Sequence, residues 1–122
     1  MLIRQEIPAD ADAIAAVHTA AFRSRAEPGA EVVEARLVGE LREDGDLIAP
    51  LSLVAVQDGV IVGHVCCSPG RLGDDKTSVV GLGPLGVRPE RQHDGVGKAL
   101  MHATYTPDLR GEFRYCPAFE RL

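Results

Sequence analysis

The chain has 122 residues, of which 45% are hydrophobic and 25% are charged. This composition is that of an ordinary folded protein and excludes an intrinsically disordered chain, and the length suits a single domain over residues 1–122. The 18 acidic and 13 basic residues give a net charge of −5, which disfavours nucleic-acid binding. No segment approaches the roughly 18 consecutive apolar residues of a membrane span, and the start lacks a signal-peptide pattern. We therefore expect a cytoplasmic protein that binds no membrane.

The cysteines are the adjacent pair Cys66 and Cys67 and the distant Cys116. Their number and spacing correspond to neither a disulfide framework nor a set of metal ligands. We expect reduced cysteines that pack in strands, and no metal site.

The first segment predicts a strand followed by a helix. Residues 2–7 suit a short strand, and Asp10 is placed to cap a helix that ends at the breaker sequence in residues 25–29. The apolar residues of this helix recur at helical spacing and should face the core: Ile14, Val17, Ala21 and Phe22. His18 lies in the same stripe, where a packing role is commoner than a ligand role.

A second helix is predicted over residues 30–43, after this breaker. Its buried stripe should comprise Val33, Leu37 and Leu41. The run of charges at residues 42–46 is most simply a solvated helix end and loop. We assign it no function.

Two β-rich runs follow, at residues 51–56 and 60–66. They are joined at Asp58-Gly59, a pair that readily adopts positive φ and is a strong signal for a hairpin. The two runs should therefore pair antiparallel.

After a polar loop at residues 71–76, a further strand is predicted over residues 77–87. The glycines and the proline at residues 81–84 predict a bulge or splay in it, because proline donates no ladder hydrogen bond. A third helix is expected over residues 95–104. The fold class is therefore mixed α/β, with helices layered on one dominant sheet.

Residues 81–86 formally satisfy the G-x-G-x-x-G pattern of dinucleotide-binding proteins. That pattern works only where the glycines open a helix, whereas here the strand continues to Val87 and Pro89 follows. We reject a dinucleotide site at this position.

Residues 88–98 fit an anion site better. Gly95 and Gly97 let the backbone approach a ligand closely, and the helix behind them supplies free N–H groups and the positive end of its dipole. Arg91 and Lys98 add positive charge, so we expect phosphate as the ligand. The alternative is a glycine-softened loop with a solvated basic helix start.

These segments resemble the central motif of the GNAT acetyltransferases. The resemblance rests on residues 82–87 and 89–92 and on the family's Q/R-x-x-G-x-G/A loop, which is matched by Gln92, Gly95 and Gly97. It implies a central, mostly antiparallel sheet flanked by helices, with a splayed fourth strand before the loop. Residues 113–119 resemble the C-terminal strand of a subgroup of uncharacterised bacterial acetyltransferases.

The resemblance implies that the chain binds acetyl-CoA as an acyl donor. The backbone of Leu85, Gly86 and Val87 would hydrogen-bond the pantetheine arm, and the loop amides would hold the pyrophosphate. The implied loop residues are Arg91, Gln92, His93, Asp94, Gly95, Val96, Gly97 and Lys98. The implied activity is direct transfer of an acetyl group to a primary amine of a small molecule or a protein, steadied by a main-chain N–H.

The family pattern matches residues 1–104, and residues 105–122 depart from it. The family normally continues with further strands and a fourth helix that often carries a catalytic Tyr. Tyr105 and Tyr115 match that Tyr in neither position nor context, and residues 78–81 supply no carboxylate base. The catalytic residues and the acceptor amine are therefore left open, and the alternative function is a shortened, weak or inactive CoA-binding module.

Without those elements, one side of the splayed strand would lie uncovered. Partner chains cover exposed strand edges and apolar surface, so we expect a homodimer in which residues 110–116 are the exchanged strand. The alternative is that this strand folds back on its own sheet, where it fills the place of the missing strand in a monomer.

Overall fold

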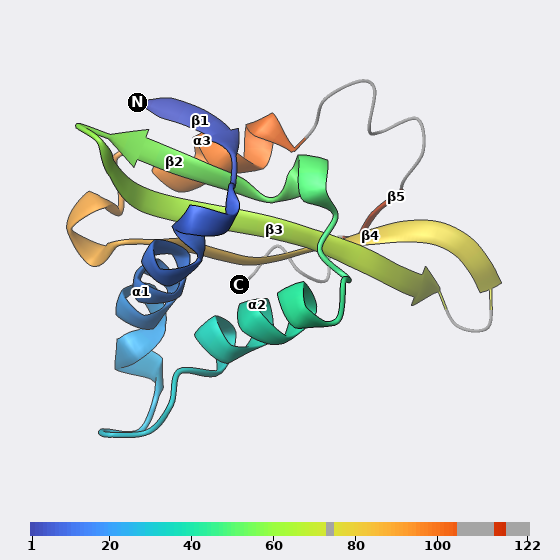
Figure 1. Cartoon of the computed structure of the whole chain (residues 1–122), viewed down its shortest axis with the longest axis horizontal. Helices are drawn as coiled ribbons and strands as arrows, with labels where there is room; N and C mark the ends of the chain where they lie inside the picture. Colours follow the sequence, from blue (N-terminus) through green and yellow to red (C-terminus); the bar gives the residue numbers. More distant parts are fainter. Residues whose placement is uncertain (73–74, 105–113, 117–122) are drawn as a thin grey trace.

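The computed structural model describes residues 1–72, 75–104 and 114–116 (Figure 1). Its helices are α1 (Ala11–Phe22), α2 (Val33–Glu43) and α3 (Val96–Ala103). Its strands are β1 (Leu2–Gln5), β2 (Leu53–Gln57), β3 (Val60–Leu72), β4 (Asp75–Val87) and β5 (Arg114–Cys116). Short 3₁₀ helices at Pro8–Asp10, Arg23–Arg25, Ala49–Leu51 and Pro89–Arg91 flank these elements. Within the described ranges, no helix has the length and apolar character needed to cross a membrane.

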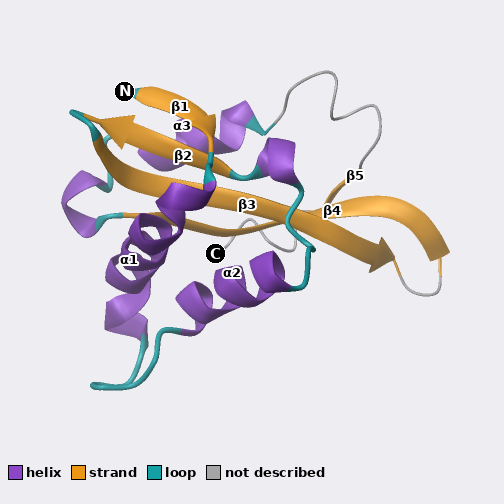
Figure 2. Ribbon diagram, in the orientation of Figure 1, coloured by secondary structure: helices purple, strands orange, loops and turns teal. Residues whose placement is uncertain are grey.

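One sheet joins the strands of the described residues in the order β1-β2-β3-β4-β5. Neighbours are antiparallel as far as β4, and β5 pairs parallel to β4. Figure 2 shows α1 and α2 on one side of this sheet and α3 on the other. The fold is therefore mixed α/β with a mostly antiparallel sheet flanked by helices, which confirms the predicted class.

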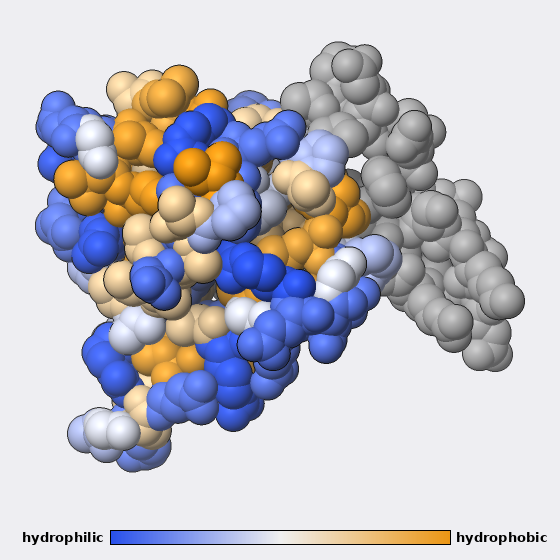
Figure 3. Space-filling view, viewed as in Figure 1, coloured by the Kyte–Doolittle hydropathy of each residue, from blue (hydrophilic) through white to orange (hydrophobic). Residues whose placement is uncertain are grey.

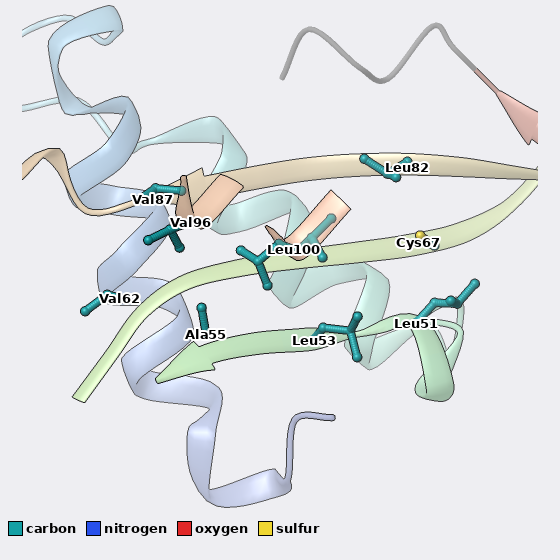
Figure 4. Packing of buried hydrophobic residues seen from close by; sticks show 10 residues of the cluster. Leu51, Leu53, Ala55, Val62, Cys67, Leu82, Val87, Val96 and Leu100 are labelled. Carbon is teal, nitrogen blue, oxygen red and sulfur yellow. The ribbon is translucent and has the colours of Figure 1, made fainter. Parts of the chain in front are cut away.

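The two faces of the sheet carry separate apolar cores. On the α3 face, Leu100 packs with Ala55 of β2 in a cluster that Figure 4 shows from close by. On the opposite face, Ile14 of α1 and Val38 of α2 pack with Val54 of β2. Because successive side chains of a strand point to opposite faces, neighbouring residues of one strand serve both cores.

The second helix differs from its prediction in its start and in its buried face. It begins at Val33 rather than at residue 30, and Val33 is 57% exposed. Val32 and Val38 are buried instead, while Leu37 and Leu41 are half-buried. Val32 has an extended backbone and is already packed in the core when the helix begins, so the buried stripe is shifted from the predicted one.

The hairpin of β3 and β4 extends through most of the predicted polar loop at residues 71–76. β3 runs to Leu72, which pairs with Asp75 at the start of β4. Ladder hydrogen bonds use the backbone alone, so a polar composition does not prevent strand pairing. The loop prediction was too long for this reason.

β4 has an irregularity where glycine and proline predicted one. Val65 pairs with Leu85 and Cys67 pairs with Leu82, so β4 holds one more residue than β3 between these pairs. This is a bulge, as the sequence predicted. β5 pairs only with residues 79–81, so beyond the bulge the outer edge of β4 has no strand partner among the described residues.

In the structure, Arg114–Cys116 pairs with β4 of the same chain. This pairing is the arrangement that the sequence left as the alternative to strand exchange. The remaining residues of the segment 105–122, including Tyr105, lie outside the described residues.

Candidate functional site

The end of β4 borders a cavity of about 260 Å³. Leu85, Gly86 and Val87 line it together with Gln92 of the following loop. The facing wall comes from α1 and the 3₁₀ helix after it and comprises Ala21, Phe22 and Arg25. The cavity therefore lies on the α1 face of β4, beside the stretch of that strand whose outer edge is unpaired.

Phe22 and Arg25 were not predicted as site residues. Phe22 was expected in the core and is 5% exposed, yet it also borders the cavity. The guanidinium carbon of Arg25 lies 5.6 Å from the centre of the Phe22 ring, which is a cation–π contact. Apolar periodicity marks Phe22 as buried but cannot distinguish a core wall from a cavity wall, and Arg25 lies in a segment that the sequence marks only as a breaker.

The loop after β4 reverses the chain through two residues of positive φ. His93 has a φ of 74° and Gly95 a φ of 83°. Gln92 ties the loop to the strand, because its Nε2 donates a hydrogen bond to the Val87 carbonyl oxygen at 3.1 Å. The loop thereby delivers the chain to the N-terminus of α3.

The first turn of α3 presents backbone donors that the helix does not use. The N–H of Ala99 donates to the Gly95 carbonyl at 3.0 Å, so the N–H groups of Val96, Gly97 and Lys98 precede the first helical bond. These amides and the positive end of the helix dipole favour an anion. The Val96 side chain is 1% exposed and belongs to the core, so only its backbone can serve a ligand.

The structure brings together some of the predicted site residues and leaves others apart. Leu85, Gly86, Val87 and Gln92 line the cavity, while residues 95–98 form the N-terminus of α3. Three predicted residues of the loop do not line the cavity, namely Arg91, His93 and Asp94. Lys98 does not line it either and is exposed in the first turn of α3.

Gly86 lies directly against the imidazole of His18. A Cβ on Gly86 would be 2.7 Å from His18 Nδ1 and 3.5 Å from the Ala21 Cβ. The first of these distances is far inside van der Waals contact, so β4 and α1 fit together only without a side chain at this position. His18 itself is fully buried, as its place in the apolar stripe predicted.

Next to the cavity, a chain of polar groups crosses the α1 face of the sheet. His18 Nε2 lies 2.8 Å from His64 Nδ1, and His64 Nε2 lies 3.1 Å from Glu6 Oε1. The Ser52 hydroxyl donates to the same Glu6 oxygen and lies 3.0 Å from His64 Nε2. Arg42 Nη2 donates to the other Glu6 oxygen, Oε2, at 2.7 Å. We call this set of five residues the polar chain.

Arg42 corrects a prediction from the sequence. The charged end of α2 was expected to be solvated, whereas Arg42 is half-buried against Glu6, whose side chain is 13% exposed. A carboxylate removed from water needs a partner, and Arg42 supplies it. The two residues are 36 positions apart, so no local pattern indicates that they meet.

The polar chain is charged at Glu6 and neutral at its histidines. Burial would raise the pKa of Glu6, but the hydrogen bonds from His64, Ser52 and Arg42 lower it to about 2. Burial lowers the pKa of His18 to about 3, and the charges of His64 and Arg42 act in the same direction. Burial also lowers the pKa of His64, although Glu6 opposes this effect. At neutral pH both imidazoles are therefore uncharged.

Cys66 and Cys67 are buried strand residues, consistent with the structural role expected of them. Burial raises the pKa of the Cys67 thiol to about 12 and raises the pKa of Cys66 as well. Cys66 Sγ donates to the Gly83 carbonyl oxygen at 3.4 Å. A thiol that stays protonated is a poor nucleophile, so neither residue is suited to covalent catalysis.

Comparison with known proteins relates most of the chain to one family. Residues 14–106 match the acetyltransferase (GNAT) family. The uncharacterized N-acetyltransferase YhbS of Escherichia coli K12 is 39% identical over 116 residues, which are 94% of this chain. The chain spans 63% of the length of that relative.

Two solved structures agree with this match. A GNAT family acetyltransferase from Brucella melitensis in complex with acetyl-CoA is 39% identical with a TM-score of 0.79, over 90% of this chain and 68% of that one. YhbS from Escherichia coli in complex with CoA is 36% identical with a TM-score of 0.71, over 83% of this chain and 52% of that one. On its sequence match and its fold, the chain belongs to the acetyltransferase (GNAT) family.

Proposed function

We propose that this protein transfers an acetyl group from acetyl-CoA to a primary amine of a small molecule or a protein. The observation that carries the proposal is the cavity in which Leu85, Gly86 and Val87 meet Gln92 of the loop. The relatives from Brucella melitensis and Escherichia coli hold acetyl-CoA and CoA, respectively. Family membership favours this activity over the alternative of an inactive CoA-binding module.

The pantetheine arm fits the outer edge of β4. On that side residues 85–87 have no strand partner among the described residues. Apart from the Val87 carbonyl, which accepts from Gln92, their outward backbone groups can pair with the amides of the arm as a strand would. The pyrophosphate suits the free N–H groups of residues 96–98. Arg91 and Lys98 give the loop positive charge in a chain whose net charge is −5.

Acetyl-CoA supplies a thioester that a neutral amine can attack directly. In this transfer the amine nitrogen bonds to the carbonyl carbon of the acetyl group and the carbon–sulfur bond breaks. The amine loses a proton, and CoA leaves as a thiolate that takes up a proton to become the thiol. The contribution of the chain is to hold the thioester beside β4 and to steady the developing oxyanion with a main-chain N–H of that strand. Cys66 and Cys67 take no part.

Two measurements test this proposal on the full chain. Acetyl-CoA should raise the melting temperature, because a ligand that binds the folded state stabilises it. A free-thiol assay over a panel of amines should show CoA release that depends on the amine. Absence of both effects would contradict the proposal, and a thermal shift without release for any amine would favour the CoA-binding module.

We also propose that two copies of the chain associate. Figure 3 shows hydrophobic side chains gathered around β1 at the N-terminal edge of the sheet, and Met1, Leu2 and Ile7 are 59%, 59% and 53% exposed. An exposed edge strand with apolar residues is a surface that a partner chain covers. Sedimentation over a wide concentration range should show the mass of a dimer, and the mass of a single chain at every concentration would contradict this.

A cytoplasmic location is part of the same proposal. Cys66 and Cys67 are free thiols, which suits a reducing compartment. Fractionation of cells that express the tagged chain tests the location, and recovery outside the cytoplasm would contradict it.

A further inference from the structure

The wall of the cavity that faces β4 carries a cation. Of the described residues that line the cavity, Arg25 alone is charged, and it comes from the 3₁₀ helix that follows α1. The opposite wall is the end of β4 at residues 85–87, next to Gln92 of the loop. The side chain of Arg25 is exposed, so a ligand that enters the cavity can reach it.

Arg25 makes no hydrogen bond or ion pair within the described part of the chain. Three other arginines there are bound to carboxylates, namely Arg4, Arg36 and Arg42. Arg23, on the same 3₁₀ helix as Arg25, donates to the main-chain carbonyls of Glu27 and Ala30. A guanidinium carries five N–H donors in a planar fork. The donors of Arg25 are therefore available to a ligand.

Phe22 holds the guanidinium of Arg25 at the wall of the cavity. The guanidinium carbon lies 5.6 Å from the centre of the Phe22 ring, and Phe22 is only 5% exposed. The ring is itself fixed by packing, since the His18 ring lies 6.2 Å away with the two planes 9° apart. A cation over a fixed ring is attracted to its face and keeps its charged end in water. The contact restricts a long side chain before a ligand arrives, which lowers the entropy cost of binding.

The proposed pyrophosphate site adjoins the other face of the same strand end. A Cβ on Gly97 would lie 3.4 Å from Leu85 Cδ2 and 3.7 Å from Val87 Cγ2, so the first turn of α3 rests against the end of β4. Figure 2 shows α3 and α1 on opposite sides of the sheet. The free N–H groups of residues 96–98 thus flank the edge of β4 on one side, and Arg25 flanks it on the other.

We propose that Arg25 binds the pyrophosphate of the acyl donor from the side opposite the α3 amides, and that Phe22 is a positioning residue for it. This inference rests on the proposed function, which places the pyrophosphate at residues 96–98. The amides are neutral donors, whereas the guanidinium supplies a full charge and a fork that matches two phosphate oxygens. In a chain of net charge −5, this cation also offsets the repulsion of a polyanionic donor.

Arg25→Gln tests the contact with ligands that differ in their phosphates. The variant should bind acetyl-CoA about tenfold more weakly, because a charge-assisted hydrogen bond is lost. Acetyl-3′-dephospho-CoA keeps the pyrophosphate but lacks the 3′-phosphate, so its affinity should fall by the same factor. S-Acetylpantetheine lacks both groups and should bind the variant and the wild type equally. Titrations followed by the amide resonances of the protein measure all three affinities, including the weakest.

The matched control is Arg23→Gln. It removes the same charge from the same 3₁₀ helix, but from a side chain that does not line the cavity. It should leave the affinity for acetyl-CoA within about twofold of wild type. Equal losses in the two variants would mean that net charge acts from a distance and would overturn the contact. A loss for acetyl-CoA alone, with the dephospho compound unaffected, would assign Arg25 to the 3′-phosphate and contradict the pyrophosphate contact.

Two further variants test the fork and its support. Arg25→Lys keeps the charge but not the fork, so it should recover only part of the lost affinity. Phe22→Leu keeps an apolar side chain without the ring and should weaken acetyl-CoA binding about threefold. In the Arg25→Gln background the same change at Phe22 should leave the affinity unaltered. A purely structural role of Phe22 would instead give the same loss in both backgrounds.

Failure of this inference and failure of the proposed function give different results. If the wild type binds acetyl-CoA and Arg25→Gln binds it equally well, Arg25 is not a binding residue, while the proposed function stands. If the wild type does not bind acetyl-CoA, the proposed function itself is overturned.

Discussion

Two regions of the molecule that lie near the cavity rest on different physical principles. The loop after β4 works through its backbone, with positive φ at His93 and Gly95 and free N–H groups at residues 96–98. The polar chain works through buried side chains, in which His18 contacts His64 and His64 contacts Glu6. The loop is contiguous in sequence, whereas these two contacts join residues 46 and 58 positions apart.

This difference separates what each region contributes. Side chains on the loop surface can change with little effect on folding, because the proposed binding uses backbone N–H groups that every residue except proline has. Each group of the polar chain is a hydrogen-bond partner of the next. The loss of one group therefore leaves a buried polar atom without a hydrogen bond, which lowers the free energy of unfolding. We therefore expect changes in the polar chain to alter stability more than binding, and changes in the loop to alter binding more than stability.

The largest effect should come from acid and should act on the polar chain. The pKa of His18 is about 3 in the folded protein against an ordinary 6.5, so the unfolded chain takes up this proton first as the pH falls. The free energy of unfolding is therefore at its full value above pH 6.5 and falls by about 1.4 kcal/mol per pH unit down to about pH 3. Urea unfolding at pH 7 and at pH 4 should differ by about 3 kcal/mol on account of His18.

Glu6 extends this loss to lower pH. Its pKa falls from 4.5 to about 2 on folding, so its stabilising contribution is present above pH 4.5 and is lost as the pH drops from 4.5 toward 2. The control is His18→Gln, which has no ring to titrate and should lose most of the slope between pH 6.5 and pH 4.5. The same slope in wild type and variant would show that His18 is not the group responsible.

The next effect should appear at Gly86, where the two regions meet. In Gly86→Ala the new Cβ would lie 2.7 Å from His18 Nδ1 and 3.1 Å from His18 Cε1, so β4 and α1 must move apart. Overpacking of this kind costs about 1–3 kcal/mol, which urea unfolding would measure, and acetyl-CoA should bind more weakly because the edge of β4 moves.

A double-mutant cycle identifies the partner in that clash. His18→Ala removes the ring, so Gly86→Ala should destabilise the His18→Ala protein less than it destabilises wild type. Additive effects of the two changes would mean that Gly86 is constrained by something other than His18.

The sequence predicted the region built from local rules and missed the region built from distant contacts. Turn and breaker residues located the hairpin at Asp58-Gly59, the bulge at residues 81–84 and the helix that starts beside Gly95, because φ preference and lost donors act within a few residues. The proposed acetyl-CoA residues come from a family motif that is equally compact, and their role stays a prediction. Helical spacing also placed His18 inside, which was correct.

What the sequence could not supply is the pairing of buried polar groups. His18 was predicted to be a packing residue and Arg42 a solvated one, since neither has its partner within a helical turn. The buried stripe of α2 failed for a related reason, because the docking of Val32 before the helix decides which face turns inward. Such pairings depend on which elements lie side by side, and periodicity within one element carries no information about that.

A smaller effect is expected at Gly95 in the loop. Gly95 has a φ of 83° and nothing within 4 Å of the place of a Cβ, so a substitution there strains the backbone without a clash. Gly95→Ala should cost about 1 kcal/mol of stability and weaken acetyl-CoA binding about tenfold, because the loop amides turn away. Calorimetric titration measures the affinity. Gly95→Asn should lose less, since Asn tolerates positive φ, and equal losses would contradict a conformational role.

The smallest effect should come from Lys98, whose side chain is exposed and would place a positive charge beside the proposed anion site. Exposed charges contribute little and are screened by salt, so Lys98→Ala should weaken acetyl-CoA binding about two- to fivefold at low salt and less at about 0.5 M salt, with stability unchanged. Gly95→Ala provides the contrast, because it acts through the backbone conformation and its loss of affinity should persist at high salt. Titrations of both variants at the two salt concentrations therefore separate side-chain charge from backbone recognition. A loss at Lys98 that salt does not reduce would show that the loop also binds through a fixed side-chain contact, and the division between backbone and side-chain recognition would then fail.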